Sequence, residues 1–211
     1  MKKLIVFDMD GTLADTSPGI LNSHRYAHEK MGRPQPATDV LRSVIGGPLL
    51  NSYETRFGFS DIQAREAVSH YRNYYAERGY LEAELYPGMK ETLTKLRENG
   101  YSLGVATLKA ERFVKTMLEN MGIAECFDVI FGMDDADTRT KAQLIQMCMQ
   151  TVGASSDATT MVGDSIHDLN GAQQVGVDFI GVTYGFGFCV NETAAGSFCN
   201  TPLELADLLC S

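Results

Sequence analysis

Two acidic residues stand two positions apart near the start of the chain, where residues 6–15 read VFDMDGTLAD. Asp8 and Asp10 directly follow the apolar run Leu4–Phe7, which is typical of a buried strand. Alternate side chains of a strand point to the same face, and Gly11 allows the backbone to turn away at this point. The pattern predicts paired carboxylates at the carboxyl end of a strand, where open α/β sheets bind their ligands.

A second acidic pair lies far downstream, in the segment MVGDSIHDLNGA. Asp164 follows another apolar run, and Asp168 falls four residues later in the first turn of an expected helix. If the two strands are neighbours in a parallel sheet, all four carboxylates meet at one edge, where they raise one another's pKa unless a cation lies between them. A small set of oxygen ligands suits Mg²⁺. The spacing therefore predicts a magnesium site.

A calcium-binding loop of the EF-hand type is an alternative interpretation of D-x-D-G. Aligning Gly11 with the glycine of such a loop puts Val6 at the first ligand position and Ser17 at the last. Neither residue supplies the carboxylate required there, so this alternative fails. Helix capping by Asp8 and a surface turn at Asp164 would explain each acid alone, but not their shared placement after two apolar strands.

Short apolar runs alternate with helical patterns over most of the chain, which is typical of a parallel sheet. The expected strands are Lys3–Asp8, Ser102–Thr107, Asp128–Phe131, Thr159–Gly163 and Asp178–Val182. The expected helices include Met89–Asn99 and Glu111–Met121, each followed by a glycine, and two that open with the capping-box pairs Thr140/Gln143 and Thr201/Glu204. We therefore predict an α/β fold with a Rossmann-like parallel sheet.

The stretch of residues 16–84 interrupts this alternation. It contains no convincing strand, and helical patterns cover Pro18–Met31, Asp39–Val44, Leu49–Phe57 and Ser60–Arg78. Ser60 and Gln63 form a further capping-box pattern, and the residues expected on one buried face are Ile62, Val68, Tyr71 and Tyr75. We predict a core of residues 1–15 and 85–211, with a small helical cap domain of residues 16–84 inserted after the first acidic motif.

Composition narrows the possible partners and location. The formal net charge of −9 argues against nucleic acid as the main partner, because nucleic-acid binders usually present a basic face. No apolar stretch approaches the roughly 20 residues that cross a bilayer, so no membrane partner is expected. The five cysteines, which never form C-x-x-C, fit reduced thiols in a cytoplasmic protein: Cys126, Cys148, Cys189, Cys199 and Cys210.

The motifs together carry a family resemblance. DMDGTLAD, then GVATLK with Thr107, then Lys141, then GDSIHD resemble the haloacid dehalogenase superfamily over essentially the whole chain. A helical insertion directly after the first motif is similar to the cap of the phosphoglycolate phosphatase-like branch. The resemblance implies a Mg²⁺-dependent phosphatase that acts on a small phosphorylated metabolite, as a monomer or homodimer.

The resemblance also implies roles for the acids. Asp8 would attack the phosphorus of a monoester and form an aspartyl-phosphate. Asp10 would protonate the leaving group and then deprotonate the attacking water. Asp8, the main-chain carbonyl of Asp10, and Asp164 would hold Mg²⁺, with Asp168 binding directly or through water.

Polar and basic residues complete the implied site. Thr107 would donate its hydroxyl to a phosphoryl oxygen, and Lys141 would bind that oxygen and Asp8. A cation in the first turn of a helix opposes the helix dipole, so Lys141 suggests an anionic partner. Arg139 could take its place, and Lys109 is a weaker candidate for phosphate binding. Leu108 departs from the small polar residue that is usual in the branch.

The substrate and its contacts stay open between alternatives. The cap would select the substrate, and the candidate contacts are Asn22, Arg25, Gly46 and Gly47. A 5′-nucleotidase with the same mechanism is the main alternative to a phosphoglycolate phosphatase. A sugar phosphomutase would need a cap lysine, for which Lys30 is the only candidate in residues 16–84. A dehalogenase would not need Asp10, and a receiver switched by aspartyl phosphorylation would be shorter.

Overall fold

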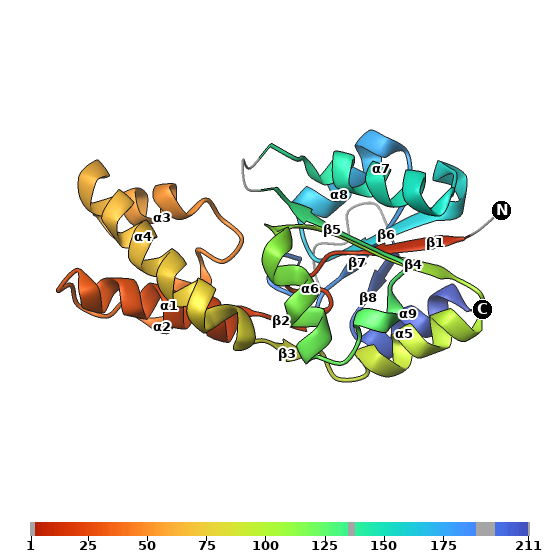
Figure 1. Cartoon of the computed structure of the whole chain (residues 1–211), viewed down its shortest axis with the longest axis horizontal. Helices are drawn as coiled ribbons and strands as arrows, with labels where there is room; N and C mark the ends of the chain where they lie inside the picture. The colour runs from red at the N-terminus through yellow and green to blue at the C-terminus, as the bar shows by residue number, and fades with distance from the viewer. Residues whose placement is uncertain (1–2, 135–137, 189–196, 211) are drawn as a thin grey trace. The chain divides into compact units, whose positions relative to one another are not determined.

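The structure is a computed structural model, and it describes residues 3–134, 138–188 and 197–210. The chain folds into two compact units. The first, the core unit, consists of Met1–Asp15 and Glu84–Ser211, and the second, the helical unit, consists of Thr16–Ala83. Figure 1 shows a sheet flanked by helices in the core unit and only helices in the helical unit.

The described residues of the core unit contain one six-stranded sheet in the order β5-β4-β1-β6-β7-β8, with every neighbouring pair parallel. The strands are β1 (Leu4–Phe7), β4 (Ser102–Ala110), β5 (Val129–Met133), β6 (Thr159–Gly163), β7 (Asp178–Val182) and β8 (Ser197–Cys199). The predicted parallel α/β sheet is confirmed, and β6 and β7 have the predicted bounds. Central β1 lies between β4 and β6, so the residues that follow these three strands meet at one edge.

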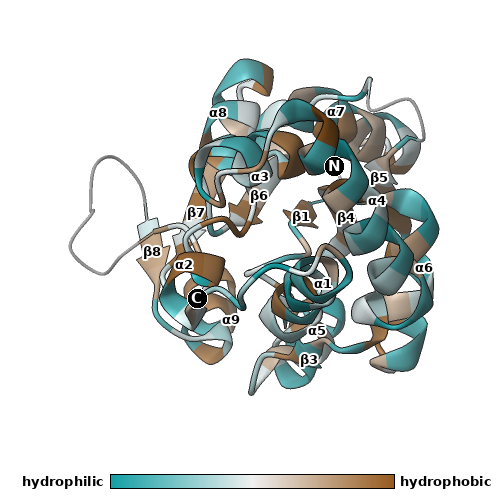
Figure 2. Cartoon of the chain, turned by 90° about the vertical axis from the view of Figure 1, so that its left-hand side faces the viewer, coloured by the Kyte–Doolittle hydropathy of each residue, from teal (hydrophilic) through white to brown (hydrophobic). Residues whose placement is uncertain are grey.

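Helices cover both faces of the sheet. Figure 1 shows α7 and α8 on one face and α5, α6 and α9 on the other. On the first face, Leu4 and Val6 of β1 pack in one buried cluster with Leu144 and Cys148 of α7. Figure 2 shows β1 in the brown of apolar residues, whereas α6 carries both brown and teal residues. The helices are α5 (Met89–Glu98), α6 (Glu111–Asn120), α7 (Lys141–Val152), α8 (Ile166–Val175) and α9 (Pro202–Leu209), and short 3₁₀ turns cover Ala124–Cys126 and Ser156–Ala158.

Two predicted capping boxes have different outcomes. Thr140 and Gln143 form the predicted box at the start of α7, each side chain accepting the backbone N–H of the other. At α9 the Thr201 hydroxyl accepts the Glu204 N–H, but the Glu204 carboxylate accepts the N–H of Asn200 at 2.7 Å. The predicted reciprocal box at α9 is therefore wrong in one half, because a neighbouring donor takes the carboxylate.

A two-stranded antiparallel pair marks the point where the chain leaves and re-enters the core unit. It consists of β2 (Ala14–Asp15) and β3 (Glu84–Leu85), and the Tyr86 N–H donates to the Leu13 carbonyl beside it. Glu84 belongs to the core unit because it pairs with Asp15.

The helical unit is built around α1 and α4. Its helices are α1 (Ser17–Lys30), α2 (Thr38–Arg42), α3 (Leu49–Thr55) and α4 (Asp61–Glu77), followed by a 3₁₀ turn at Gly79–Leu81. Ser60 and Gln63 form the predicted capping box. The predicted buried face of α4 is partly wrong: Ile62 is 79% exposed, whereas the small residues Ala64 and Ala67 are buried with Tyr71 and Tyr75.

Aromatic side chains and two histidines form the interior of the helical unit. The rings of His24 and His28 on α1 pack against Tyr53 and Phe57, with centroids 4.8–6.1 Å apart. Burial, together with a smaller effect of the neighbouring His28, lowers the pKa of His24 to about 3. His24 is therefore a neutral core residue at physiological pH.

Two further observations concern the chain as a whole. Within the described ranges, no helix is both long enough and apolar enough to cross a bilayer. Four cysteines are free thiols, as predicted: Cys126, Cys148, Cys199 and Cys210. Cys189 lies outside the described residues.

Candidate active site

Asp8 lies at the carboxyl end of the central strand. Its backbone N–H donates to the Val162 carbonyl of β6 at 3.0 Å, so pairing with the neighbouring strand continues up to this residue. The chain then turns at Gly11, whose φ of 75° lies in the left-handed region that glycine adopts without strain. Asp8 is only 7% exposed and is held at the junction of β1 and β6.

Three buried carboxylates converge at this end of the sheet. Asp8, Asp164 and Asp168 each place one carboxylate oxygen within 4.8 Å of the others. Burial raises the pKa of Asp8 to about 7; Lys141 acts against this shift, whereas Asp168 and Asp164 add to it. Burial also raises the pKa of Asp164 to about 6. The cluster therefore concentrates more negative charge than its side-chain partners balance.

Lys141 is the cation of this cluster. It opens α7, is 6% exposed, and places its Nζ 2.7 Å from an oxygen of Asp8, 2.7 Å from an oxygen of Asp168 and 2.9 Å from the Ala106 carbonyl. Burial disfavours its charged form, but the carboxylates of Asp168 and Asp8 outweigh this and raise the pKa of Lys141. The lysine that opposes the helix dipole is thus compensated by two acids.

Both carboxylate oxygens of Asp168 are already engaged. Its Oδ2 accepts the backbone N–H of Ser165 at 3.1 Å and the Ser165 hydroxyl at 2.6 Å, and its Oδ1 pairs with Lys141. Asp168 is fully buried at the start of α8. This arrangement suits a residue that orients Lys141 and binds a cation through water.

Asp10 lies in the turn after β1 and contacts Lys109. The Lys109 Nζ is 2.9 and 3.0 Å from the two carboxylate oxygens of Asp10, and the Lys109 side chain is 6% exposed. The sequence singled out Lys109 only as a weak phosphate-binding candidate. The structure instead brings it to the second acid of the first motif.

The sequence predicted that Thr107 ends its strand. In the structure β4 continues to Ala110, so Thr107 lies inside the strand. The register between β4 and β5 shifts between Ala106 and Ala110, so the intervening residues leave the regular ladder. The Thr107 oxygen accepts the backbone N–H of Lys109 at 3.2 Å, which leaves the hydroxyl proton available for donation. Thr107 is 1% exposed, and Leu108, after it, is 39% exposed.

The loop after β7 contacts the site through its backbone, and sequence reasoning assigned it no role. The N–H groups of Phe186 and Gly187 donate to Oδ2 of Asp164 at 2.6 and 3.2 Å, and the Phe188 N–H donates to the Asp164 carbonyl at 2.8 Å. Tyr184 donates its hydroxyl to the Thr12 carbonyl at 3.1 Å. The loop therefore connects the two acidic motifs. Its only signal in the sequence is the pair of glycines in YGFG.

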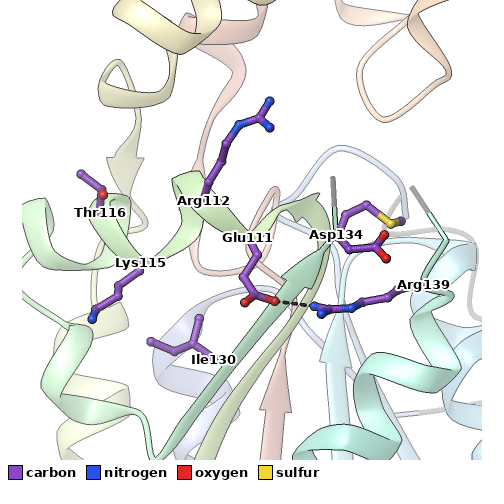
Figure 3. A pocket seen from close by; sticks show the side chains of 8 residues that line it. Glu111, Arg112, Lys115, Thr116, Ile130, Asp134 and Arg139 are labelled. Atoms are coloured by element: carbon purple, nitrogen blue, oxygen red, sulfur yellow. Dashed lines mark hydrogen bonds and ion pairs between the residues drawn. The ribbon is translucent and has the colours of Figure 1, made fainter. Parts of the chain in front are cut away.

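Arg139 belongs to a neighbouring cavity. Its guanidinium donates to the Glu111 carboxylate and to the Gly132 carbonyl, and Figure 3 shows it directed at Glu111. Arg139 and Glu111 also line a cavity of about 530 Å³, together with Arg112, Lys115 and Asp134. The interpretation of Arg139 as a substitute for Lys141 is not supported by this geometry, because Lys141 alone of the two contacts Asp8.

The candidate substrate contacts of the cap lie in the helical unit. Asn22 donates its amide to Glu82, and Arg25 donates to the Asn22 side chain and to Thr38. Gly46 has a φ of 79°. Gly47 lies beside it before α3, and a Cβ there would make only ordinary contacts. Of the four residues, Asn22 and Arg25 contact each other. The part of all four in substrate binding stays a prediction.

The donor set fits a divalent cation. The acidic cluster offers only oxygen ligands. Burial raises the pKa of Asp8 and Asp164 because it disfavours their charged forms, and a bound cation would stabilise those charged forms. Oxygen ligands in small number are those that Mg²⁺ takes while it keeps several waters.

Fold and site together define a class: α/β enzymes whose chemistry is carried by clustered carboxylates at the carboxyl end of a parallel sheet. A family model described as "haloacid dehalogenase-like hydrolase" matches residues 5–182, and the chain belongs to this family. The predicted family membership is therefore confirmed.

Relatives of the chain carry several names. A protein named 5′-nucleotidase from Pseudomonas aeruginosa is 38% identical over 87% of this chain and 83% of its own length. A protein named phosphoglycolate phosphatase from Yersinia pseudotuberculosis is 31% identical over 97% of this chain and 90% of its own length. The solved structure of Protein Tyrosine Kinase A from Mycobacterium tuberculosis is similar with a TM-score of 0.85 and 31% identity, covering 100% of this chain and 99% of that one.

Proposed function

We propose that the protein is a Mg²⁺-dependent phosphatase that hydrolyses a small phosphomonoester through an aspartyl-phosphate on Asp8. The observation that carries this proposal is the buried Asp8 carboxylate, which lies 2.7 Å from Lys141 and within 4.8 Å of Asp164 and Asp168. A carboxylate held at the open edge of a sheet beside a lysine can approach a phosphate dianion, because the cation offsets repulsion.

In the first step an oxygen of Asp8 attacks the phosphorus. The new oxygen–phosphorus bond forms as the bond to the ester oxygen breaks, and the leaving alkoxide takes a proton from Asp10. The Thr107 hydroxyl donates to a phosphoryl oxygen, since its own oxygen already accepts the Lys109 N–H. Lys141 stabilises the charge that develops on the same phosphoryl group.

In the second step water removes the phosphoryl group from Asp8. Asp10 takes a proton from the water, whose oxygen attacks phosphorus and releases inorganic phosphate together with the Asp8 carboxylate. Lys109, which pairs with both oxygens of Asp10, is a positioning residue that keeps this carboxylate at the edge of the site between the two proton transfers.

The metal ligands in this proposal are Asp8, the Asp10 main-chain carbonyl and Asp164. When bound, Mg²⁺ would neutralise the carboxylates and the phosphate dianion. Asp168, whose two oxygens are engaged by Ser165 and Lys141, contributes through water.

The substrate class is a small phosphorylated metabolite, with phosphoglycolate as the first candidate and a nucleoside 5′-monophosphate as the second. Two relatives that match more than four fifths of this chain carry the names of these two phosphatases. In this proposal the helical unit acts as a cap, and Asn22, Arg25, Gly46 and Gly47 are its candidate substrate contacts. The protein acts in the cytoplasm as a monomer or homodimer, without nucleic acid or membrane as a partner.

The test is a comparison of kcat/KM for phosphoglycolate, nucleoside monophosphates and hexose phosphates, with release of inorganic phosphate as the readout. We expect hydrolysis of at least one of the first two classes in Mg²⁺. Interconversion of hexose phosphates without phosphate release would instead indicate a mutase. Lack of phosphate release from every phosphomonoester would contradict the proposal.

A further inference from the structure

One oxygen of Asp164 is saturated by backbone donors. Oδ2 accepts the N–H groups of Phe186 and Gly187, whereas no hydrogen bond or ion pair from the described parts of the chain reaches Oδ1. Asp164 therefore keeps Oδ2 turned to the loop, while its Oδ1 has no hydrogen bond within the described parts of the chain.

Two glycines allow the loop to approach this closely. A Cβ on Gly185 would lie 2.2 Å from the Gly11 carbonyl oxygen and 2.4 Å from the Asp164 Cβ, and a Cβ on Gly187 would lie 2.4 Å from the Asp164 carbonyl oxygen. Neither glycine has a positive φ, so the requirement is space rather than an unusual backbone conformation. Any side chain at these positions must displace the loop from Asp164.

Gly11 packs closely against the same oxygen. A Cβ on Gly11 would lie 2.2 Å from Oδ2 of Asp164. Oδ2 is thus packed between the turn of the first motif and the loop after β7, and rotation of the carboxylate to offer both oxygens would break two hydrogen bonds. Leaving these buried backbone donors unpaired would be destabilising.

A carboxylate constrained to one oxygen discriminates between divalent cations. Mg²⁺ requires a near-octahedral shell at about 2.0–2.1 Å, whereas the larger Ca²⁺ takes six to eight oxygens and readily uses both oxygens of one carboxylate. We propose that the loop of residues 185–187 sets the metal selectivity of the site: by occupying Oδ2 it forces Asp164 to bind through Oδ1 alone, which favours Mg²⁺ over Ca²⁺. This inference rests on the proposed function, in which Asp164 is a metal ligand.

The test is calorimetric titration of the metal-free protein with MgCl₂ and with CaCl₂, without substrate. We expect the wild type to bind Mg²⁺ more tightly than Ca²⁺. In Gly187→Ala and Gly185→Ala we expect Mg²⁺ affinity to fall about tenfold and Ca²⁺ affinity to change less than threefold. Phe186→Leu is the matched control: it keeps the backbone N–H that donates to Asp164 and should keep the ratio of the two affinities within twofold.

Infrared difference spectra of the wild type provide a second test that needs no loop variant. On addition of Mg²⁺ the Asp164 carboxylate band, assigned by its loss in Asp164→Asn, should show the splitting of a one-oxygen ligand. A two-oxygen splitting, or an unchanged Mg²⁺/Ca²⁺ ratio in folded glycine variants, would overturn the inference while leaving the proposed function intact. Absence of Mg²⁺ binding to the wild type would contradict the proposed function itself.

Discussion

Replacement of Lys141 by methionine removes the cation of the acidic cluster while keeping a side chain of similar length. The Lys141 ammonium lies 2.7 Å from both Asp8 and Asp168, and the residue is 6% exposed. Removing one partner of a buried ion pair leaves an uncompensated charge and costs about 3–5 kcal/mol. We therefore expect Lys141→Met to lower the free energy of unfolding by about that amount at pH 8 in the absence of metal.

The loss should depend on pH in a defined direction. The pKa of Asp8 is already raised to about 7, and without the lysine it rises further. A carboxyl whose folded-state pKa lies above its unfolded value stabilises the fold below the unfolded pKa, and this stabilisation is lost as pH rises toward the folded value. Asp8 can bind a proton at pH 5.5 and relieve the repulsion, so the destabilisation should shrink there.

The assay is urea unfolding at pH 5.5 and pH 8, in EDTA and in Mg²⁺. Lys95→Met is the matched control, because Lys95 pairs with Asp207 at the same 2.7 Å but both side chains are exposed, and such pairs contribute little. Mg²⁺ should restore part of the stability of Lys141→Met. A loss no larger than that of Lys95→Met, or one that grows toward acidic pH, would refute the reasoning.

Three further predictions concern other parts of the chain. Asp10→Asn should lower the rate of phosphate release by at least a hundredfold, because the variant cannot transfer the proton. Its Mg²⁺ affinity, measured by calorimetry, should stay within threefold of the wild type, because the proposed metal contact of Asp10 is its main-chain carbonyl. An unaltered rate would exclude Asp10 as the general acid. EDTA should abolish hydrolysis of p-nitrophenyl phosphate, with recovery on addition of Mg²⁺; a metal-independent rate would contradict the cation site. The pKa of His24 is lowered to about 3, so neutral His24 contributes fully to stability above pH 6.5, and this contribution is lost below pH 6.5 at about 1.4 kcal/mol per pH unit. His24→Phe should therefore flatten the pH dependence of the free energy of unfolding between pH 6.5 and 4.5. An identical slope in the variant would exclude His24 as a source of this pH dependence.

The sheet and the acids that follow its strands could be predicted because they depend on local patterns. Thr159–Gly163 and Asp178–Val182 are strands with the predicted bounds, since each is a short apolar run between turn residues. Neighbouring parallel strands then bring the residues after β1 and β6 to the same edge, which is why Asp8 and Asp164 meet.

Other features depend on long-range geometry. The contact between Lys109 and Asp10 requires the irregular register at the end of β4, for which the sequence carries no turn residue. The loop at Phe186 and Gly187 acts through backbone N–H groups, which have no side-chain signature.

Short strands and small buried residues were the other sources of error. The β2 and β3 strands have two residues each, too few for a period to be seen. Ile62 is exposed because α4 buries the small Ala64 and Ala67 instead, and a pattern based on large apolar residues overlooks them.

Trapping of the covalent intermediate tests the central claim most directly. The wild-type protein is mixed with p-nitrophenyl phosphate and Mg²⁺, quenched in acid within one turnover, digested, and analysed by mass spectrometry. One phosphoryl group on the peptide that contains residues 6–15, localised to Asp8 and absent in Asp8→Asn, is the predicted result. Rapid phosphate release with no phosphoryl group on Asp8, or with the group on another residue, would contradict Asp8 as the nucleophile.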